Sequence, residues 1–147
     1  MIHVRWMIRR DMPEVINICN DTDEYLTSLL RQRDCIGMVA EIGERIVGMM
    51  VYELHKQELL IIRCVVHPSY RRQGIGRLMM SKLTAKLSPS RRTKMKFIVS
   101  EHSFGGLQFL KKLGFKATKV LRNQFSDWED SWDGYLMKYS LPRMECV

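Results

Sequence analysis

The fold is decided by the stretch Val66-His67-Pro68-Ser69-Tyr70-Arg71-Arg72-Gln73-Gly74-Ile75-Gly76-Arg77-Leu78-Met79. It follows an apolar run, crosses a basic turn that holds two glycines, and continues with the spacing of an amphipathic helix. Gly74 and Gly76 lack the Cβ atoms that would block an approaching phosphate. A helix that begins here offers unpaired N–H groups and the positive end of its macrodipole. The stretch therefore predicts a strand, a pyrophosphate-binding turn and a helix.

Three arginines, Arg71, Arg72 and Arg77, add positive charge to this turn. The spacing is not that of the dinucleotide fingerprint, which needs three glycines as G-x-G-x-x-G and an acidic residue about 20 positions later. It is not that of a Walker loop either, because no G-K-[ST] follows. Both of these phosphate-binding motifs are therefore excluded.

The composition is that of one globular domain. With 147 residues, 46% of them apolar and 27% charged, the chain is long enough to bury about two thirds of its unfolded surface. We expect a single domain over residues 1–141 and a flexible tail over residues 142–147. No apolar run approaches the roughly 18 residues of a membrane span, and the amino terminus lacks the apolar core of a signal peptide. We therefore expect a cytoplasmic protein.

The four cysteines, Cys19, Cys35, Cys64 and Cys146, are widely spaced and form no C-x-x-C pair. They are expected to be reduced thiols, and no metal site is expected. The net charge of +8 would suit an anionic partner such as nucleic acid or a ribosomal surface. The chain lacks the basic and aromatic repeats of single-strand binders, so a ligand with several phosphates explains the charge more simply.

The periodicity predicts an α/β order of elements. Strands are expected at about residues 3–8, 36–42, 45–54, 58–66, 96–100, 115–122 and 134–141, and helices at about 11–19, 21–33, 74–87 and 104–113. Asp11-Met12-Pro13-Glu14 is expected to form a capping box at the start of the first helix. A meander followed by strand-helix-strand-helix-strand indicates a mixed sheet with a parallel section.

The R-x-x-G-x-G spacing, preceded by V-x-P, resembles the acetyl-CoA signature of the GNAT superfamily of N-acetyltransferases. Leu110-Lys111-Lys112-Leu113-Gly114-Phe115 falls where that family has a Y-x-x-x-G-F segment, so the resemblance covers nearly the whole chain. Within the family, the chain is most similar to the RimI-like protein N-terminal (ribosomal-protein alanine) acetyltransferases. That similarity rests on Trp6-Met7-Ile8-Arg9, Val66-His67-Pro68 and Gly134-Tyr135-Leu136-Met137.

The resemblance implies a fold, a cosubstrate and a reaction. The fold is a GNAT-like mixed α/β one, with a mainly antiparallel sheet of about seven strands, a parallel splayed section and about four flanking helices. The reaction is acetyl transfer from acetyl-CoA to a primary amine by direct attack in a ternary complex, with a protein N-terminal α-amine as the expected acceptor. The backbone N–H of Val66 would bind the developing oxyanion. The residues expected to hold acetyl-CoA are Cys64, Val65, Val66, Arg71, Arg72, Gln73, Gly74, Ile75, Gly76, Arg77 and Ser103.

Three positions depart from the family pattern. The tyrosine of Y-x-x-x-G-F, the usual proton donor to the leaving thiolate, is Leu110, and the glutamate often used as base is Ile98. The asparagine common at the start of the next helix is Ser103, which can still cap that helix or hydrogen-bond the cofactor. A thiol with a pKa of roughly 8.5 leaves fairly well. An attacking amine must be neutral, however, so the missing base favours an α-amine with a pKa near 8 over a lysine near 10.4.

Replacement acids and bases are expected among a few polar residues. Glu101 and Tyr135 are the leading candidates for catalytic residues. Alternatives are His67, Glu53 and Glu58, and each of the five could instead be a surface or packing residue. Arg63 is a lone charge in an apolar strand, so it must be paired or must reach a wet cleft.

The segment from Ser126 to Asp133 places four acids and two tryptophans in one loop of a basic chain. Such a loop could attract a cationic amine and stack against it, or could be a solvated loop anchored by its tryptophans. Two other functions stay open: transfer to lysine, a polyamine or another small amine, and a CoA-binding interaction module that has lost its chemistry. We expect a monomer or weak dimer, with no membrane partner and no dedicated nucleic-acid binding.

Overall fold

The computed structural model describes residues 1–19 and 22–142. Within these residues seven strands follow the order β1-β2-β3-β4-β5-β7-β6, mostly antiparallel with one parallel pair, and four α-helices accompany them. The mixed α/β class, the strand number and the helix number expected from the sequence are confirmed. The chain divides into two compact units, unit 1 with residues 1–55 and 61–86, and unit 2 with residues 56–60 and those from 87 onward.

The elements of unit 1 are β1 (Ile2–Trp6), the 3-10 helix η1 (Arg9–Asp11), α1 (Met12–Cys19), α2 (Asp23–Arg31), β2 (Cys35–Ile42), β3 (Arg45–Leu54), most of β4 (Glu58–Val66), the 3-10 helix η2 (Pro68–Tyr70) and α3 (Ile75–Thr84). Unit 2 contains the start of β4 and then β5 (Lys94–Ser100), α4 (Phe104–Lys112), β6 (Lys116–Ser126) and β7 (Ser131–Ser140). None of the helices in the described ranges is long and apolar enough to cross a membrane.

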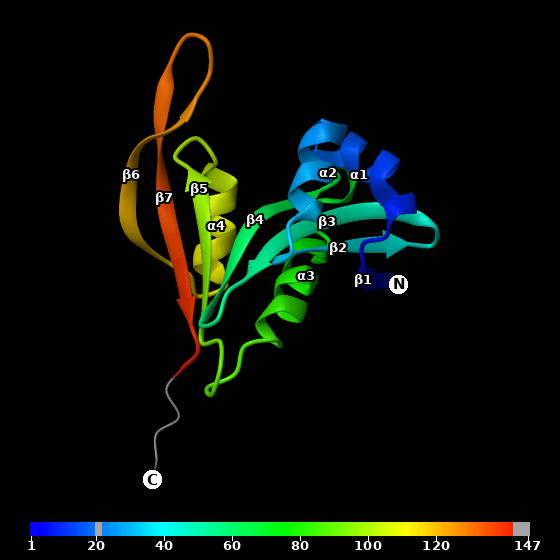
Figure 1. Ribbon diagram of the computed structural model, residues 1–147, viewed down its shortest axis with the longest axis horizontal. Coiled ribbons are helices and arrows are strands. Elements are labelled where there is room, and N and C mark those ends of the chain that lie inside the picture. The colour runs from blue at the N-terminus through cyan, green and yellow to red at the C-terminus, as the bar shows by residue number, and fades with distance from the viewer. Residues whose placement is uncertain (20–21, 143–147) are drawn as a thin grey trace. The chain divides into compact units, whose positions relative to one another are not determined.

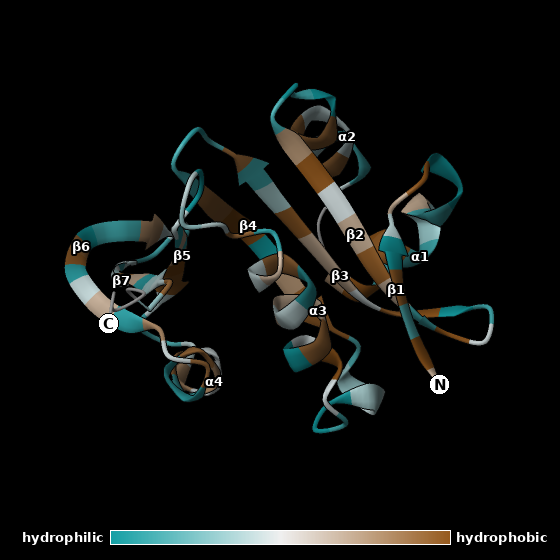
Figure 2. Ribbon diagram, turned by 90° about the horizontal axis from the view of Figure 1, so that it is seen from below, coloured by the Kyte–Doolittle hydropathy of each residue, from teal (hydrophilic) through white to brown (hydrophobic). Residues whose placement is uncertain are grey.

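In unit 1, helices cover both faces of the sheet (Figure 1). The face under α1 and α2 buries an apolar cluster that includes Val15, Leu26, Val39, Met49 and Val51. The apolar colouring of Figure 2 runs along β2 and β3, which supply the sheet side of this cluster. Because β3 is buried along nearly its whole length, both of its faces read as apolar in the sequence, which is typical of a central strand.

The opposite face of the same sheet receives α3. A Cβ atom on Gly48 of β3 would lie 3.0 Å from Cε of Met79 and 3.1 Å from Cγ2 of Ile75. Glycine at this position therefore allows α3 to approach the strand closely. Met80 and Leu83 are buried on the same helix. The N-terminus of α3 is thus held by packing against β3.

In unit 2, β7 lies between β5 and β6 and is antiparallel to both. Leu110 of α4 and the following Phe115 are buried, and Phe115 packs against Tyr139 of β7 with ring centroids 5.7 Å apart. The loop expected over residues 126–133 is shorter, because β6 continues to Ser126 and β7 begins at Ser131. The predicted extent of that loop is therefore wrong.

The capping box predicted for the first helix is also wrong. Asp11 lies in η1, where its carboxylate accepts the N–H of Ile8 at 2.8 Å and both terminal nitrogens of Arg5 at 2.8 and 2.9 Å. Glu14 reaches away from the helix start and accepts the N–H of Ile46 in β3 at 3.0 Å. Both carboxylates therefore tie the first helical segments to strands.

Candidate functional site

The turn after β4 is held by hydrogen bonds to the neighbouring strand and within itself. The N–H of His67 donates to the carbonyl of Val47 in β3 at 2.8 Å, and the N–H of Tyr70 donates to the carbonyl of His67 at 2.9 Å. Nδ1 of His67 accepts the N–H of Ser69 at 3.1 Å. His67, an alternative candidate for the base, thus uses one ring nitrogen to stabilise the turn.

Tyr70 is a residue of this turn that sequence reasoning missed. The guanidinium of Arg45 lies 5.6 Å from the centroid of its ring, and the ring of His67 meets it edge-on at 5.5 Å. A turn residue has no periodic pattern that would mark it as packed. Its position between Pro68 and the arginines was the only available signal.

A left-handed glycine begins α3. Gly74 has φ +82°, and its carbonyl accepts the N–H of Leu78 at 2.9 Å. An added Cβ would meet no atom within 4 Å, so glycine is required here by the backbone conformation and not by a clash within the protein. Arg72, two residues earlier, also has a positive φ of +64°. Two left-handed residues in three positions make the turn into the helix tight.

Exposure and positive charge coincide at this end of α3. Arg71, Arg72, Gln73 and Arg77 are exposed, and the first helical turn contains no acidic residue. The first N–H groups of a helix have no intrahelical acceptor, and arginine forks match phosphate oxygens, so this end suits a diphosphate. Ile75 is only 1% exposed, so its backbone alone is available to a ligand.

The last residues of β4 lead directly into this turn. Cys64, Val65 and Val66 are half-buried, and the carbonyl of Val66 accepts a hydrogen bond from Nε of Arg71 at 3.2 Å. Although part of Cys64 is exposed, desolvation raises the pKa of its thiol to about 12. The thiol is therefore protonated at neutral pH and is not a thiolate nucleophile.

Arg63, the lone charge of β4, contacts the end of a helix. One terminal nitrogen of its guanidinium donates to the carbonyl of Cys19, the last residue of α1, at 3.0 Å. Cations are favourable at helix C-termini, where carbonyl groups lack intrahelical donors. The sequence required Arg63 either to be paired or to reach a wet cleft, and the structure shows it paired, with the carbonyl of Cys19.

The leading catalytic candidates, Glu101 and Tyr135, lie in unit 2. Oε1 of Glu101 accepts the N–H of Asp133 at 2.9 Å, and the N–H of Glu101 donates to the carbonyl of Asp133 at 2.9 Å. Tyr135 is half-buried on β7, opposite Val99 of β5. Ser103 is the N-cap residue of α4, but its hydroxyl makes no capping hydrogen bond, and a Cβ on Gly106 would lie 2.6 Å from its Oγ.

Two other acidic candidates contact basic side chains. Oε2 of Glu53 lies 2.9 Å from Nε2 of His55, and Oε2 of Glu58 lies 2.8 Å from Nζ of Lys96. At the position of the family tyrosine, Leu110 is 1% exposed and belongs to the apolar core of unit 2. It can donate no proton, so the departure from the family pattern stands.

The two tryptophans at the tip of the β6–β7 hairpin differ in packing and exposure. Trp132 stacks on Phe125 at 6.3 Å and contacts the ring of His102 at 5.3 Å, whereas Trp128 is fully exposed. The carboxylate of Asp127 accepts the N–H groups of Glu129 and Asp130, and these bonds lower its pKa. Only one of the two tryptophans therefore anchors the loop.

The predicted cofactor residues, apart from Ser103, are brought together in unit 1 by the end of β4, the turn and the start of α3. Ser103, Glu101 and Tyr135 are residues of unit 2.

Residues 1–115 match the model of a family described as the acetyltransferase (GNAT) family. The chain therefore belongs to the GNAT family, whose members are acyltransferases with acetyl-CoA as cosubstrate. No curated protein sequence matches it.

Solved structures share the fold at low sequence identity. The ribosomal-protein-S18-alanine N-acetyltransferase of Escherichia coli is 16% identical with a TM-score of 0.86, covering 99% of this chain and 97% of its own. Ard1 of Thermoplasma volcanium is 22% identical with a TM-score of 0.85, covering 97% and 99%. Naa50 of Arabidopsis thaliana, in complex with the bisubstrate analogue CoA-Ac-MVNAL, is 18% identical with a TM-score of 0.80, covering 95% and 99%.

Proposed function

We propose that this acetyltransferase transfers the acetyl group of acetyl-CoA to the α-amine of a protein N-terminus by direct attack in a ternary complex. The observation that carries the proposal is the start of α3, where a left-handed Gly74 precedes the first N–H groups of the helix and the exposed Arg71, Arg72 and Arg77 lie within three residues of it. These groups would hold the diphosphate of the cosubstrate. The solved structures of a ribosomal-protein-S18-alanine N-acetyltransferase and of Naa50 with the bisubstrate analogue CoA-Ac-MVNAL support the choice of acceptor.

The chemistry of the attacking amine supports the same acceptor. At pH 7 an α-amine with a pKa near 8 is about 10% neutral, whereas a lysine amine with a pKa near 10.4 is neutral in only about 0.04% of molecules. An enzyme with isoleucine at the position of the family glutamate, Ile98, gains most from an acceptor that needs little help to lose its proton.

Glu101 and Tyr135 are the residues that we propose for proton transfer. Glu101 is oriented through Oε1 by the N–H of Asp133, and no described residue donates to its Oε2, which would take the proton of the amine directly or through water. The hydroxyl of Tyr135 would protonate the departing thiolate. The backbone N–H of Val66 would stabilise the oxyanion, a role that does not depend on its side chain.

A panel of acceptors tests the proposed substrate. The protein is mixed with acetyl-CoA and one of three acceptors: peptides with a free N-terminal alanine, serine or methionine, the same peptides with a blocked N-terminus and an internal lysine, or spermidine. CoA thiol release gives the rate, and mass spectrometry locates the acetyl group. We expect transfer to the free α-amine. Transfer only to lysine or spermidine would refute that acceptor, and tight acetyl-CoA binding without transfer would favour a binding module.

Two near-isosteric variants test the catalytic roles. Glu101→Gln should lower kcat/KM by about 10²–10⁴-fold with little change in acetyl-CoA affinity. Tyr135→Phe should lower kcat with little change in acetyl-CoA affinity. Glu44→Gln, at the exposed β2–β3 turn, is the matched control and should behave as wild type. An unchanged kcat/KM in Glu101→Gln would show that the Glu101 carboxylate does not take the proton of the amine.

A further inference from the structure

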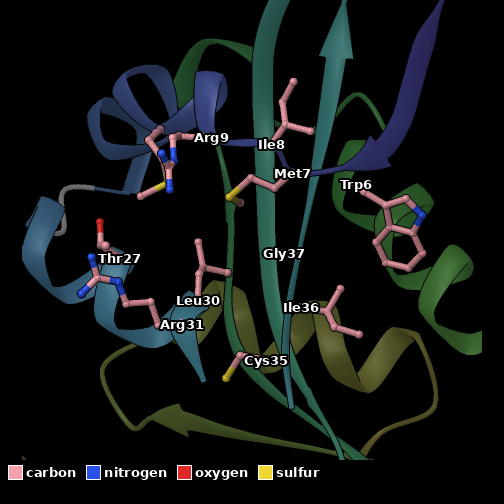
Figure 3. A pocket seen from close by; sticks show the side chains of 11 residues that line it. Trp6, Met7, Ile8, Arg9, Thr27, Leu30, Arg31, Cys35, Ile36 and Gly37 are labelled. Atoms are coloured by element: carbon pink, nitrogen blue, oxygen red, sulfur yellow. The ribbon is translucent and has the colours of Figure 1, made fainter. Parts of the chain in front are cut away.

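Unit 1 contains a groove of about 510 Å³ beside the start of β2 (Figure 3). Its walls come from the end of β1 and η1, from α1 and α2, and from the first residues of β2. The lining residues are Trp6, Met7, Ile8, Arg9, Met12, Thr27, Leu30, Arg31, Cys35, Ile36 and Gly37. The groove shares no residue with the turn after β4 or with the proposed catalytic residues, so its role is a separate question.

The groove marks the place where β1 leaves the sheet. β1 pairs with β2 up to Trp6 opposite Met38, and the N–H of Met7 still donates to the carbonyl of Gly37 at 2.9 Å. The chain then turns into η1, although β2 continues for two more residues, Cys35 and Ile36. Beyond Gly37, this edge of β2 has no neighbouring strand among residues 1–19 and 22–142.

The ladder between β2 and β3 shows which backbone group faces that edge. The N–H of Leu54 donates to the carbonyl of Asp34 at 2.8 Å. Bonded and non-bonded pairs alternate along an antiparallel ladder, so Cys35 turns its carbonyl away from β3, on the same side as the carbonyl of Gly37. The N–H of Cys35 is already used in a turn, where it donates to the carbonyl of Gln32. A carbonyl acceptor therefore faces the position that β1 has vacated.

The side chains of the groove are apolar and basic. Met7, Met12 and Leu30 are half-buried beside two exposed cations, Arg9 and Arg31, and Figure 3 shows these arginines and Thr27 on the same side of the groove. None of the described residues that line the groove is acidic. Within the described part of the chain, neither guanidinium forms an ion pair or hydrogen bond.

Two carboxylates touch lining residues from outside the groove. Asp23 accepts the hydroxyl hydrogen of Thr27 at 3.1 Å, and Glu53 lies 3.9 Å from the thiol of Cys35. Asp23 is a residue of the first turn of α2, and Oε2 of Glu53 also lies 2.9 Å from Nε2 of His55. Among the described residues that line the groove, the charged ones are therefore both cations, Arg9 and Arg31.

We propose that this groove binds an extended, acidic segment of a partner protein, which continues the path of β1 along β2. The segment would donate a backbone N–H to the carbonyl of Cys35, place apolar side chains on Met7 and Leu30, and pair carboxylates with Arg9 and Arg31. The apolar floor supplies contact area, and the two arginines select for negative charge. The proposal is independent of acetyl transfer.

A peptide series tests the proposal on the unmodified protein. A fluorescein-labelled decapeptide of alternating glutamate and leucine is titrated by fluorescence anisotropy beside its glutamine and lysine counterparts. We expect saturable binding of the glutamate peptide, about tenfold tighter than that of the glutamine peptide, and no binding of the lysine peptide. The backbone amides of alternate peptide residues face β2, and the others face away from it. N-methylation of one alternate set should therefore weaken binding, and N-methylation of the other set should not.

Paired variants separate the groove from the general positive charge of the chain. Arg9→Glu with Arg31→Glu should weaken the glutamate peptide by about tenfold or more, while acetyl-CoA affinity stays unchanged. The control pair, Lys116→Glu with Lys119→Glu, lies on exposed β6 and changes the net charge equally, so it should leave peptide binding within about twofold.

Four results would overturn the proposal. Equal loss in both variant pairs would show non-specific electrostatics. Equal binding of the glutamate and glutamine peptides would remove the role of charge. Binding that is unaffected by N-methylation of either alternate set of amides would show that the peptide does not bind as a strand. Binding of dodecanoate without binding of the glutamate peptide would show a site for a small amphiphilic anion.

Discussion

Replacing Gly74 by asparagine or aspartate separates the shape of the α3 N-terminus from its charge. Gly74 has φ +82°, and an added Cβ would meet nothing within 4 Å. Asparagine and aspartate tolerate left-handed backbone better than other residues with a Cβ, and the two side chains have nearly the same volume. The variants therefore differ at this position by one negative charge.

That charge should change stability and affinity in opposite directions. Near the positive end of the α3 macrodipole, a carboxylate stabilises the fold by about 0.3–1 kcal/mol, so Gly74→Asp should be at least as stable as Gly74→Asn. Toward a bound diphosphate the carboxylate is repulsive. Two unit charges about 6 Å apart interact by about 0.7 kcal/mol in water and about 2.8 kcal/mol at an effective dielectric constant of 20. Acetyl-CoA affinity should thus fall by about tenfold or more in the aspartate variant relative to the asparagine variant.

Calorimetric titration with acetyl-CoA gives the affinities, and urea unfolding gives the stabilities. Gly43 offers a matched control because it also has a positive φ, +62°, and open space around its Cβ position, but it lies in the β2–β3 turn. Gly43→Asp should leave acetyl-CoA affinity unchanged. The gap between Gly74→Asp and Gly74→Asn should shrink at about 1 M salt, where the Debye length is about 3 Å. Equal affinities of these two variants at low salt would refute the placement of the diphosphate.

Three further predictions concern stability. Asp11→Asn should lower the free energy of unfolding by about 1.5–3 kcal/mol, measured with urea at pH 7, because the paired hydrogen bonds with Arg5 lose their charge. Since those bonds lower the pKa of Asp11, the wild-type advantage should be present above pH 4 or so and vanish as the pH falls through the folded pKa; an advantage that persists at lower pH would contradict this. Tyr52→Phe should raise the free energy of unfolding by about 1 kcal/mol, because the buried Tyr52 hydroxyl has no hydrogen-bond partner among the described residues. Burial raises the pKa of Tyr52 to about 12, so wild-type stability should also fall between about pH 10 and 12, and a phenylalanine variant with the same loss would exclude Tyr52 as its cause. Arg72→Gly should be about 1 kcal/mol more stable than Arg72→Ala in thermal unfolding, because φ at this position is +64°, and equal stability would show that this backbone is not strained.

Much of the fold could be predicted from local patterns. The boundaries of β3 and β4 follow directly from apolar runs bounded by Gly43-Glu44 and by His55-Lys56-Gln57, and both strands have the predicted extents. The capping box predicted for the first helix was wrong because Asp11 and Glu14 have the spacing typical of a capping box, while their carboxylates bind Arg5 and the N–H of Ile46. Those partners lie in strands, so no pattern within the helix could reveal them.

The candidate site could also be predicted only in part: the turn after β4 could be predicted from the sequence, and the orientation of the proposed proton-transfer residues could not. A diphosphate-binding turn leaves local marks, because Gly74 and the arginines stand within seven consecutive residues and act through backbone conformation and charge. Residues that transfer protons have no comparable local sequence pattern. Glu101 reads as an ordinary residue at a strand end, and its hydrogen bond to Asp133 joins positions 32 residues apart. Sequence reasoning could name Glu101 as a candidate but could not see what orients it.

The burial of Leu110 bears on how catalysis can work in this chain. The position that carries a tyrosine in the family is 1% exposed here and packed as part of the core, so leucine at this position contributes to stability. Because this position is occupied by a core leucine, the leaving thiolate of CoA must be protonated by another group or by water. A leaving thiol with a pKa of roughly 8.5 makes that loss tolerable, whereas activation of the amine is the harder demand. The acceptor that we propose, an α-amine of low basicity, would meet that demand without a strong base. The identity of the acceptor and the replacement of the family glutamate by Ile98 therefore belong to one argument.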